Sequence, residues 1–251
     1  MWNPELPIPE KTSEYFLDFV PDDKVKIAYA ASMGQKVEKE EEIELFRENI
    51  PRFDFLSVRE PSICSFIEKF TNKKCHAVWD PTLLLQAKEY ECLMPAKECD
   101  KEYILCLFYN PTHAMKTYDK VNRYAIQKNC DVIHREKNIS PYLFLKPEES
   151  LYYAGIEEML WAVKNAKVVI TDSFHFMVFA ILFHKPLWVL ENGKRASRQT
   201  DLLSYLQLED RIYHDNLTIE ELEQEIDYEK VDLLIKEKKE YSLEFLRTAL
   251  K

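Results

Sequence analysis

Glycine is scarce in this sequence: Gly34, Gly155 and Gly193 are the only three among 251 residues. The G-x-G-x-x-G fingerprint of dinucleotide-binding proteins and the G-x-x-x-x-G-K-[ST] phosphate loop are therefore both missing. The G-x-S-x-G turn that presents the nucleophile of many hydrolases is missing too. A phosphate site in this chain must consequently be built from helix N-termini and side chains.

Long apolar runs and an excess of positive charge are also lacking. The longest uninterrupted apolar run, Phe176 to Phe183, is far too short to span a bilayer. The first residues show no export-signal pattern. The net charge of −10 argues against a broad surface for nucleic acid or anionic membrane. We therefore predict a cytoplasmic globular protein without a nucleic-acid partner or a membrane span.

The cysteines show no C-x-x-C spacing, and no histidines follow them at zinc-finger intervals, so we predict no metal site. Without an export signal they are expected to be reduced thiols that pack as small apolar residues. The six are Cys64, Cys75, Cys92, Cys99, Cys106 and Cys130.

Short apolar segments alternate with amphipathic ones, which is typical of a parallel sheet covered by helices on both faces. The pattern predicts strands at 25–30, 53–58, 103–109, 132–135, 168–171 and 187–191, and a further short apolar element at 77–85. Helices are predicted at 39–49, from Pro61 onward, at 115–128, at 152–165 and after residue 200. The irregular segment 91–101 predicts a boundary between an N-terminal α/β domain, 1–92, and a C-terminal Rossmann-like domain, 93–251.

The most apolar stretch of the chain begins with a polar sequence, Asp172-Ser173-Phe174-His175. We predict that Asp172 or Ser173 caps a helix whose apolar body is buried all round, and that His175 lies in its first turn. That turn should emerge at the carboxyl edge of the sheet, where open α/β folds bind ligands and where free N–H groups favour an anion.

Three cations follow the next predicted strand, at Lys194, Arg195 and Arg198. Because parallel strands end at one edge, we expect these side chains near the His175 helix, as a site for phosphate or carboxylate. Two plainer interpretations remain open. A histidine in a first turn is often a surface or capping residue, and a basic run is often a solvated loop.

The segments GIEEMLWAVKNAKVVITDSFHFMVFAILFHKPLWVL and SRQTDLLSYLQLEDRI resemble the C-terminal core of the polysaccharide pyruvyl transferase family. Upstream, FLSVREPSICSFIEKF and VWDPTLLL are similar to that family's "SVRE" and "DPTLLL" segments. The resemblance runs from about residue 2 to residue 213. It implies a GT-B-like pair of Rossmann-type domains.

Two features depart from the family pattern. Members usually carry glycine and threonine after the "SFH" histidine, where this chain has Phe176 and Met177. A phenylalanine there should fill the space that a glycine leaves for a ligand. Members also begin with further βα units that end in a "WNP" sequence, whereas this chain starts at Met1-Trp2-Asn3-Pro4. We therefore expect a partial N-terminal domain with an exposed sheet edge, which favours a homo-oligomer.

The resemblance implies transfer of pyruvate from phosphoenolpyruvate to two sugar hydroxyls, which forms a ketal in cell-surface exopolysaccharide biosynthesis. The acceptor would be a sugar or a lipid-linked glycan, and no cofactor is needed. His175 would be the acid that protonates the enol carbon, beside Asp172. The substrate-binding residues would be Arg59, Ser173, Lys194, Arg195 and Arg198.

Two other functions remain open. A GT-B-type glycosyltransferase would place a nucleotide sugar in the same crevice of the sheet. A catalytically inactive relative would act as a binding subunit, in which Phe176 occludes the pocket.

Overall fold

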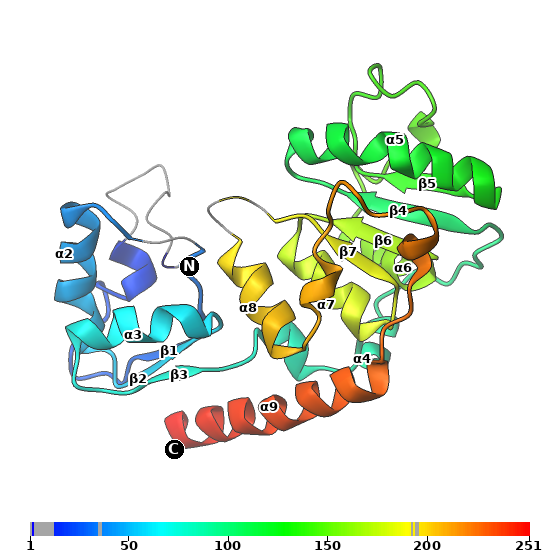
Figure 1. Cartoon of the computed structure of the whole chain (residues 1–251). Coiled ribbons are helices and arrows are strands. Elements are labelled where there is room, and N and C mark those ends of the chain that lie inside the picture. The colour runs from blue at the N-terminus through cyan, green and yellow to red at the C-terminus, as the bar shows by residue number, and fades with distance from the viewer. Residues whose placement is uncertain (1, 3–12, 35–36, 192, 194–195) are drawn as a thin grey trace. The chain divides into compact units, whose positions relative to one another are not determined.

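The computed structural model describes residues 2, 13–34, 37–191, 193 and 196–251. The chain forms two compact units (Figure 1). Unit 1 comprises Met1–Leu84, Gly193–Gln207 and Asp232–Lys251, and unit 2 comprises Leu85–Asn192 and Leu208–Val231. Two segments from the second half of the chain, Gly193–Gln207 and Asp232–Lys251, therefore belong to the same unit as the N-terminal residues, whereas the sequence predicts a single boundary near residue 92. The division into domains 1–92 and 93–251 stays a prediction.

Unit 1 is built on a parallel sheet in the order β1-β2-β3, among the residues described. Its strands are β1 (Ile27–Ala31), β2 (Phe55–Val58) and β3 (Cys75–Ala77). Its helices are η1 (Ser13–Phe16), α2 (Glu40–Asn49), η2 (Ile50–Arg52), η3 (Pro61–Ile63), α3 (Cys64–Ile67), η4 (Glu68–Phe70), η5 (Pro81–Leu84), α8 (Ser197–Tyr205) and most of α9 (Tyr228–Ala249). The absence of upstream strands, and dimerisation at a sheet edge, stay predictions.

Apolar side chains on alternate residues give the unit 1 sheet two packed faces. On one face, Leu56 and Val58 of β2 belong to a buried cluster that includes Phe46 of α2. Trp2 joins this cluster by stacking on Phe16, with ring centroids 5.4 Å apart. On the other face, Phe245 of α9 packs in a second cluster. The sheet is thus covered by helices on both sides, as the sequence pattern predicts.

Unit 2 holds a second parallel sheet, in the order β5-β4-β6-β7. Its strands are β4 (Tyr103–Leu107), β5 (Asp131–His134), β6 (Val168–Thr171) and β7 (Leu187–Val189). Its helices are α4 (Ala87–Glu91), α5 (Pro111–Lys128), η6 (Pro147–Glu149), α6 (Ile156–Asn165), α7 (Phe174–Leu182), η8 (Glu209–Arg211) and η9 (Glu220–Glu223). The protein is therefore α/β and Rossmann-like, with two all-parallel sheets.

The strand order of unit 2 places a topological switch between β4 and β6. The chain leaves β4 through α5 to β5, and then returns through α6 to β6 on the other side of β4. The prediction that 168–171 and 187–191 form neighbouring parallel strands is confirmed, because Ile170 pairs with Trp188. Every residue of β4, β6 and β7 is buried, which is typical of parallel strands covered on both faces.

Helix α7 packs less completely than its composition predicts. Met177, Val178 and Ile181 are buried, whereas Phe176 and Phe179 are half-buried. The expectation of burial all round is therefore right for one face only. Among the described residues, no helix combines the length and the apolar character that a membrane span requires.

Candidate functional site

Two helices begin at the carboxyl edge of the unit 2 sheet, beside its topological switch. Strands β4 and β6 end side by side, because Leu107 pairs with Thr171. The chain then turns into α5 after β4 and into α7 after β6. In open α/β sheets this crevice is where ligands bind, and the helix N-termini add free N–H groups and a positive dipole end. The edge between β4 and β6 is therefore the candidate site of unit 2.

Asp172 joins the two turns at this edge. Its side chain is buried, and Oδ1 accepts a hydrogen bond from the Tyr109 N–H at 2.9 Å. Oδ2 accepts from the Asn110 N–H at 2.8 Å and lies 2.9 Å from Nδ1 of His113. A buried carboxylate needs such donors, because desolvation would otherwise penalise its charge. Asp172 therefore fixes the turn between β4 and α5.

The first turn of α7 carries the histidine that the sequence analysis predicts there. Ser173 occupies the N-cap position, as predicted, but its side chain makes no capping hydrogen bond. Instead, the Ser173 N–H donates to Thr171 Oγ1 at 3.0 Å, and Thr171 Oγ1 donates to the Leu107 carbonyl at 2.8 Å. Phe174 is buried, whereas His175 is exposed. The backbone is thus anchored by Phe174 while His175 reaches solvent.

An arginine that the sequence analysis did not select also lies at this edge. Arg135 directly follows β5, and its guanidinium carbon lies 4.2 Å from the ring centroid of Tyr109 and 5.5 Å from that of Tyr152. Such cation–π contacts hold an arginine in place while leaving its N–H groups available. Next to it, burial raises the pKa of Glu136, and the negative charge of Asp172 acts in the same direction.

The carboxyl edge of the unit 1 sheet holds a buried ion pair. Arg59 follows β2 and contacts Asp80 through Nη1, and the two side chains are only 9% and 5% exposed. Asp80 Oδ1 accepts from the N–H of Thr82 at 3.0 Å and from its hydroxyl at 2.7 Å. Burial alone would raise the pKa of Asp80, but Arg59 and Thr82 outweigh it and lower that pKa. Arg59 therefore supports this edge through Asp80.

Glu60, next to Arg59, is a buried carboxyl group at the same edge of unit 1. Its Oε1 accepts from the Ser32 hydroxyl at 2.6 Å. Burial raises its pKa, although Ser32 and the charges of Arg59 and Arg198 act in the opposite direction. Arg198, in the first turn of α8, packs against Gly34, where an added Cβ would lie 3.6 Å from the guanidinium carbon. Since a cation is unfavourable at a helix N-terminus, the Glu60 carboxyl partly offsets this placement.

The predicted site residues are therefore divided between the two units. Unit 2 brings together Asp172, Ser173 and His175, and unit 1 brings together Arg59 and Arg198 around Glu60. Lys194 and Arg195 lie outside the described residues. The proximity of Arg198 to α7 stays a prediction. His113 and Arg135 could be suggested from sequence only by their positions just beyond strands of the predicted sheet.

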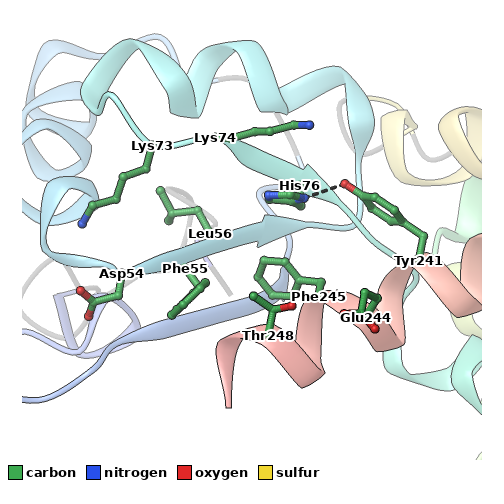
Figure 2. A pocket seen from close by; sticks show the side chains of 10 residues that line it. All are labelled: Asp54, Phe55, Leu56, Lys73, Lys74, His76, Tyr241, Glu244, Phe245 and Thr248. Atoms are coloured by element: carbon green, nitrogen blue, oxygen red, sulfur yellow. Dashed lines mark hydrogen bonds between the residues drawn. The ribbon is translucent and has the colours of Figure 1, made fainter. Parts of the chain in front are cut away.

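A separate pocket of about 310 Å³ lies in unit 1, at the opposite end of its strands (Figure 2). Residues at the starts of β2 and β3 line it, together with the last turns of α9. Phe55 and Phe245 form its aromatic part, and His76 Nδ1 shares a hydrogen bond of 2.6 Å with the Tyr241 hydroxyl. Because it faces the amino ends of the strands, this pocket does not belong to the candidate site.

In the part of the chain that the structure describes, no three His, Cys, Asp or Glu side chains lie close enough together to hold a metal ion. The two aspartates of these edges already have partners: Asp172 accepts from backbone N–H groups, and Asp80 pairs with Arg59. What the two edges share is arginine and helix N-termini, which suit anions, and the unit 2 edge adds the histidines.

These features define a Rossmann-like α/β protein with an anion-compatible edge on each sheet. The sequence profile of the polysaccharide pyruvyl transferase family matches residues 6–194, which is most of the chain. The chain belongs to this family, as its motifs predict. A comparison with curated proteins finds no matching sequence. The family implies a transferase with sugar substrates.

Proposed function

We propose that this chain transfers the pyruvyl group of phosphoenolpyruvate to two hydroxyls of a sugar or lipid-linked glycan, forming a cyclic ketal for a cell-surface polysaccharide. The observation that carries the proposal is the exposed His175 on the first turn of α7, at the switch of the sheet in a member of this family. In this reaction, an acid must protonate the enol carbon C3, so that C2 becomes electrophilic. His175 is proposed as that acid.

The anionic groups of the donor need cations and N–H donors. Phosphoenolpyruvate carries a carboxylate and a phosphate, and arginine binds both in bidentate geometry. Arg59 and Arg198 of unit 1 and the neighbouring Lys194 and Arg195 are proposed for this role, with Ser173 at the α7 N-terminus. We further propose that the two Rossmann-like units correspond to the two domains of a GT-B-like enzyme.

The test is release of phosphate from phosphoenolpyruvate in the presence of saccharide acceptors, for the wild type and for His175→Ala. Loss of a general acid typically lowers turnover by about 10²-fold or more. His184→Asn is the matched control, because His184 is exposed beyond the opposite end of the same helix and asparagine tolerates its φ of 54°. Unchanged turnover in His175→Ala would remove the acid role.

Two other functions use the same edge and are separated by the same assay. A glycosyltransferase would bind the diphosphate of a nucleotide sugar at the α7 N-terminus. Nucleotide release from a sugar nucleotide, without phosphate release from phosphoenolpyruvate, would identify that activity. Binding of an acceptor glycan without turnover of either donor would identify a non-catalytic subunit.

A further inference from the structure

The contact between Asp172 and His113 has the geometry of a carboxylate that orients an imidazole. Oδ2 of Asp172 lies 2.9 Å from Nδ1 of His113. The carboxylate itself is fixed by the Tyr109 and Asn110 N–H groups, so its position does not depend on the histidine. The side chains of Asp172 and His113 are 0% and 11% exposed, respectively. An oriented imidazole therefore lies at the sheet switch, in the first turn of α5, whereas His175 lies in the first turn of α7.

The protonation pattern of this pair follows from the carboxylate. An ionised carboxylate only accepts hydrogen bonds, so the proton between the two groups belongs to Nδ1 of His113. In a neutral imidazole the other nitrogen, Nε2, then carries a lone pair and is a base. The contact thus gives the neutral imidazole of His113 a defined tautomer, as in carboxylate–histidine pairs of hydrolases.

Helix capping does not explain this arrangement. The N-cap of α5 is Asn110, whose side chain already accepts from the Thr112 N–H at 3.0 Å, and Pro111 lacks an N–H to satisfy. His113 therefore adds nothing to the cap that Asn110 does not provide. Its contact joins the start of α5 to the residue after β6, 59 positions along the chain.

We infer that His113, oriented by Asp172, accepts the proton of the attacking sugar hydroxyl, while His175 protonates C3 of the donor. This inference rests on the proposed pyruvyl transfer. In the first step, the hydroxyl oxygen bonds to C2, its proton passes to Nε2 of His113, and C3 receives a proton from His175. In the second step, the C2–O bond to phosphate breaks and the second hydroxyl oxygen bonds to C2. Its proton leaves with phosphate as hydrogen phosphate, so the proton on His113 returns to His175 through solvent and the balance closes.

The roles of His113 and Asp172 differ in this scheme. His113 exchanges a proton with the substrate, whereas Asp172 acts through His113 as a positioning residue. Removing the imidazole should therefore lower kcat with little change in the KM for phosphoenolpyruvate, because His113 binds no group of the donor.

The experiment compares wild type, His113→Gln and Thr112→Ala for phosphate release, with kcat and KM determined separately. We expect a fall in kcat of about 10²-fold or more for His113→Gln, the usual scale for a general base. Thr112→Ala is the matched control, since Thr112 is exposed in the same first turn and its N–H remains available to Asn110. Wild-type kcat in His113→Gln, or a change confined to KM, would overturn the inference.

A second measurement uses the wild type alone and requires no turnover. Long-range proton–nitrogen NMR spectra of the wild type report which imidazole nitrogen carries the proton. We expect the Nδ1–H tautomer for His113, and an Nε2–H tautomer would overturn the inference while leaving the proposed function intact. If the wild type releases no phosphate from phosphoenolpyruvate with any acceptor, the proposed function fails, and the role of His113 in it fails as well.

Discussion

Replacing Asp80 with asparagine would remove the charge of the buried Arg59–Asp80 pair while keeping the shape of the side chain. Asp80 uses its two oxygens for different partners: Oδ1 accepts both bonds from Thr82, and Oδ2 faces Arg59. The asparagine oxygen can keep the Thr82 bonds. Its amide nitrogen would then present N–H groups to the guanidinium, so the variant isolates the interaction with Arg59.

The expected cost follows from burial of both partners. Breaking a buried ion pair by removing one charge costs about 3–5 kcal/mol, because the other charge stays desolvated. Glu60 also acts on Arg59 and offsets part of that loss, which places the expectation at about 3 kcal/mol, the lower end of this range. With a urea slope of about 1–3 kcal/mol per molar, the unfolding midpoint of unit 1 should fall by roughly 1 M or more.

The assay is urea unfolding combined with amide hydrogen exchange of β2 and β3, which reports on unit 1 separately. Glu244→Gln is the matched control, because its contact with Arg247 on α9 is exposed, and exposed pairs contribute at most about 1 kcal/mol. The pKa of Asp80 is lowered in the folded protein, so its stabilisation is present above the ordinary value of 3.8 and is lost as pH falls through the folded pKa. The difference between wild type and Asp80→Asn should therefore shrink in acid. A difference below about 1 kcal/mol at pH 7 that does not change with pH would refute the reasoning.

Three further predictions concern single residues. Burial lowers the pKa of His134, so the wild type should lose stability as pH falls below 6.5. The variant His134→Gln should therefore show a flatter slope of unfolding free energy against pH between 6.5 and 5, and an unchanged slope would contradict this. Gln207 has a φ of 57° just after α8, a conformation that glycine adopts at lower cost. Gln207→Gly should therefore stabilise unit 1 by about 0.5–1 kcal/mol and raise its urea midpoint, and a lower midpoint would count against backbone strain at this residue. Phe176 is half-buried beside His175, so Phe176→Gly should lower the KM for phosphoenolpyruvate, whereas an unchanged or higher KM would show that its ring does not restrict the site.

Sequence patterns predict the local structure of this chain well, because that structure depends on neighbouring residues. The strand 168–171 is found as predicted, and the helix that follows begins at Phe174, next to the expected caps. The parallel pairing with the next strand follows from the short strand–helix–strand connection, which Pro186 ends. The strand predicted at 187–191 is shorter, because its pairing with β6 ends at Val189.

The partners of the site residues could not be predicted in the same way, because they come from other strands. The sequence suggests Asp172 as a neighbour of His175, but its carboxylate is bonded to residues about 60 positions earlier in the chain. Which turn lies beside Asp172 depends on the strand order, and the alternation of strands and helices does not determine that order. Arg135 was missed for the same reason, since it is held by tyrosines that follow β4 and precede α6.

An aspartate just beyond a strand has a similar role at the carboxyl edge of both sheets. Asp172 follows β6 and holds the turn after β4, and Asp80 follows β3 and holds Arg59 after β2. Each carboxylate is buried and has more than one polar partner, so both are suited to fix neighbouring groups. The groups that they orient, His113 in unit 2 and Arg59 in unit 1, are therefore better candidates for contact with substrate. In this family member, mutagenesis of candidate active residues should accordingly begin with the structural partners of the buried aspartates.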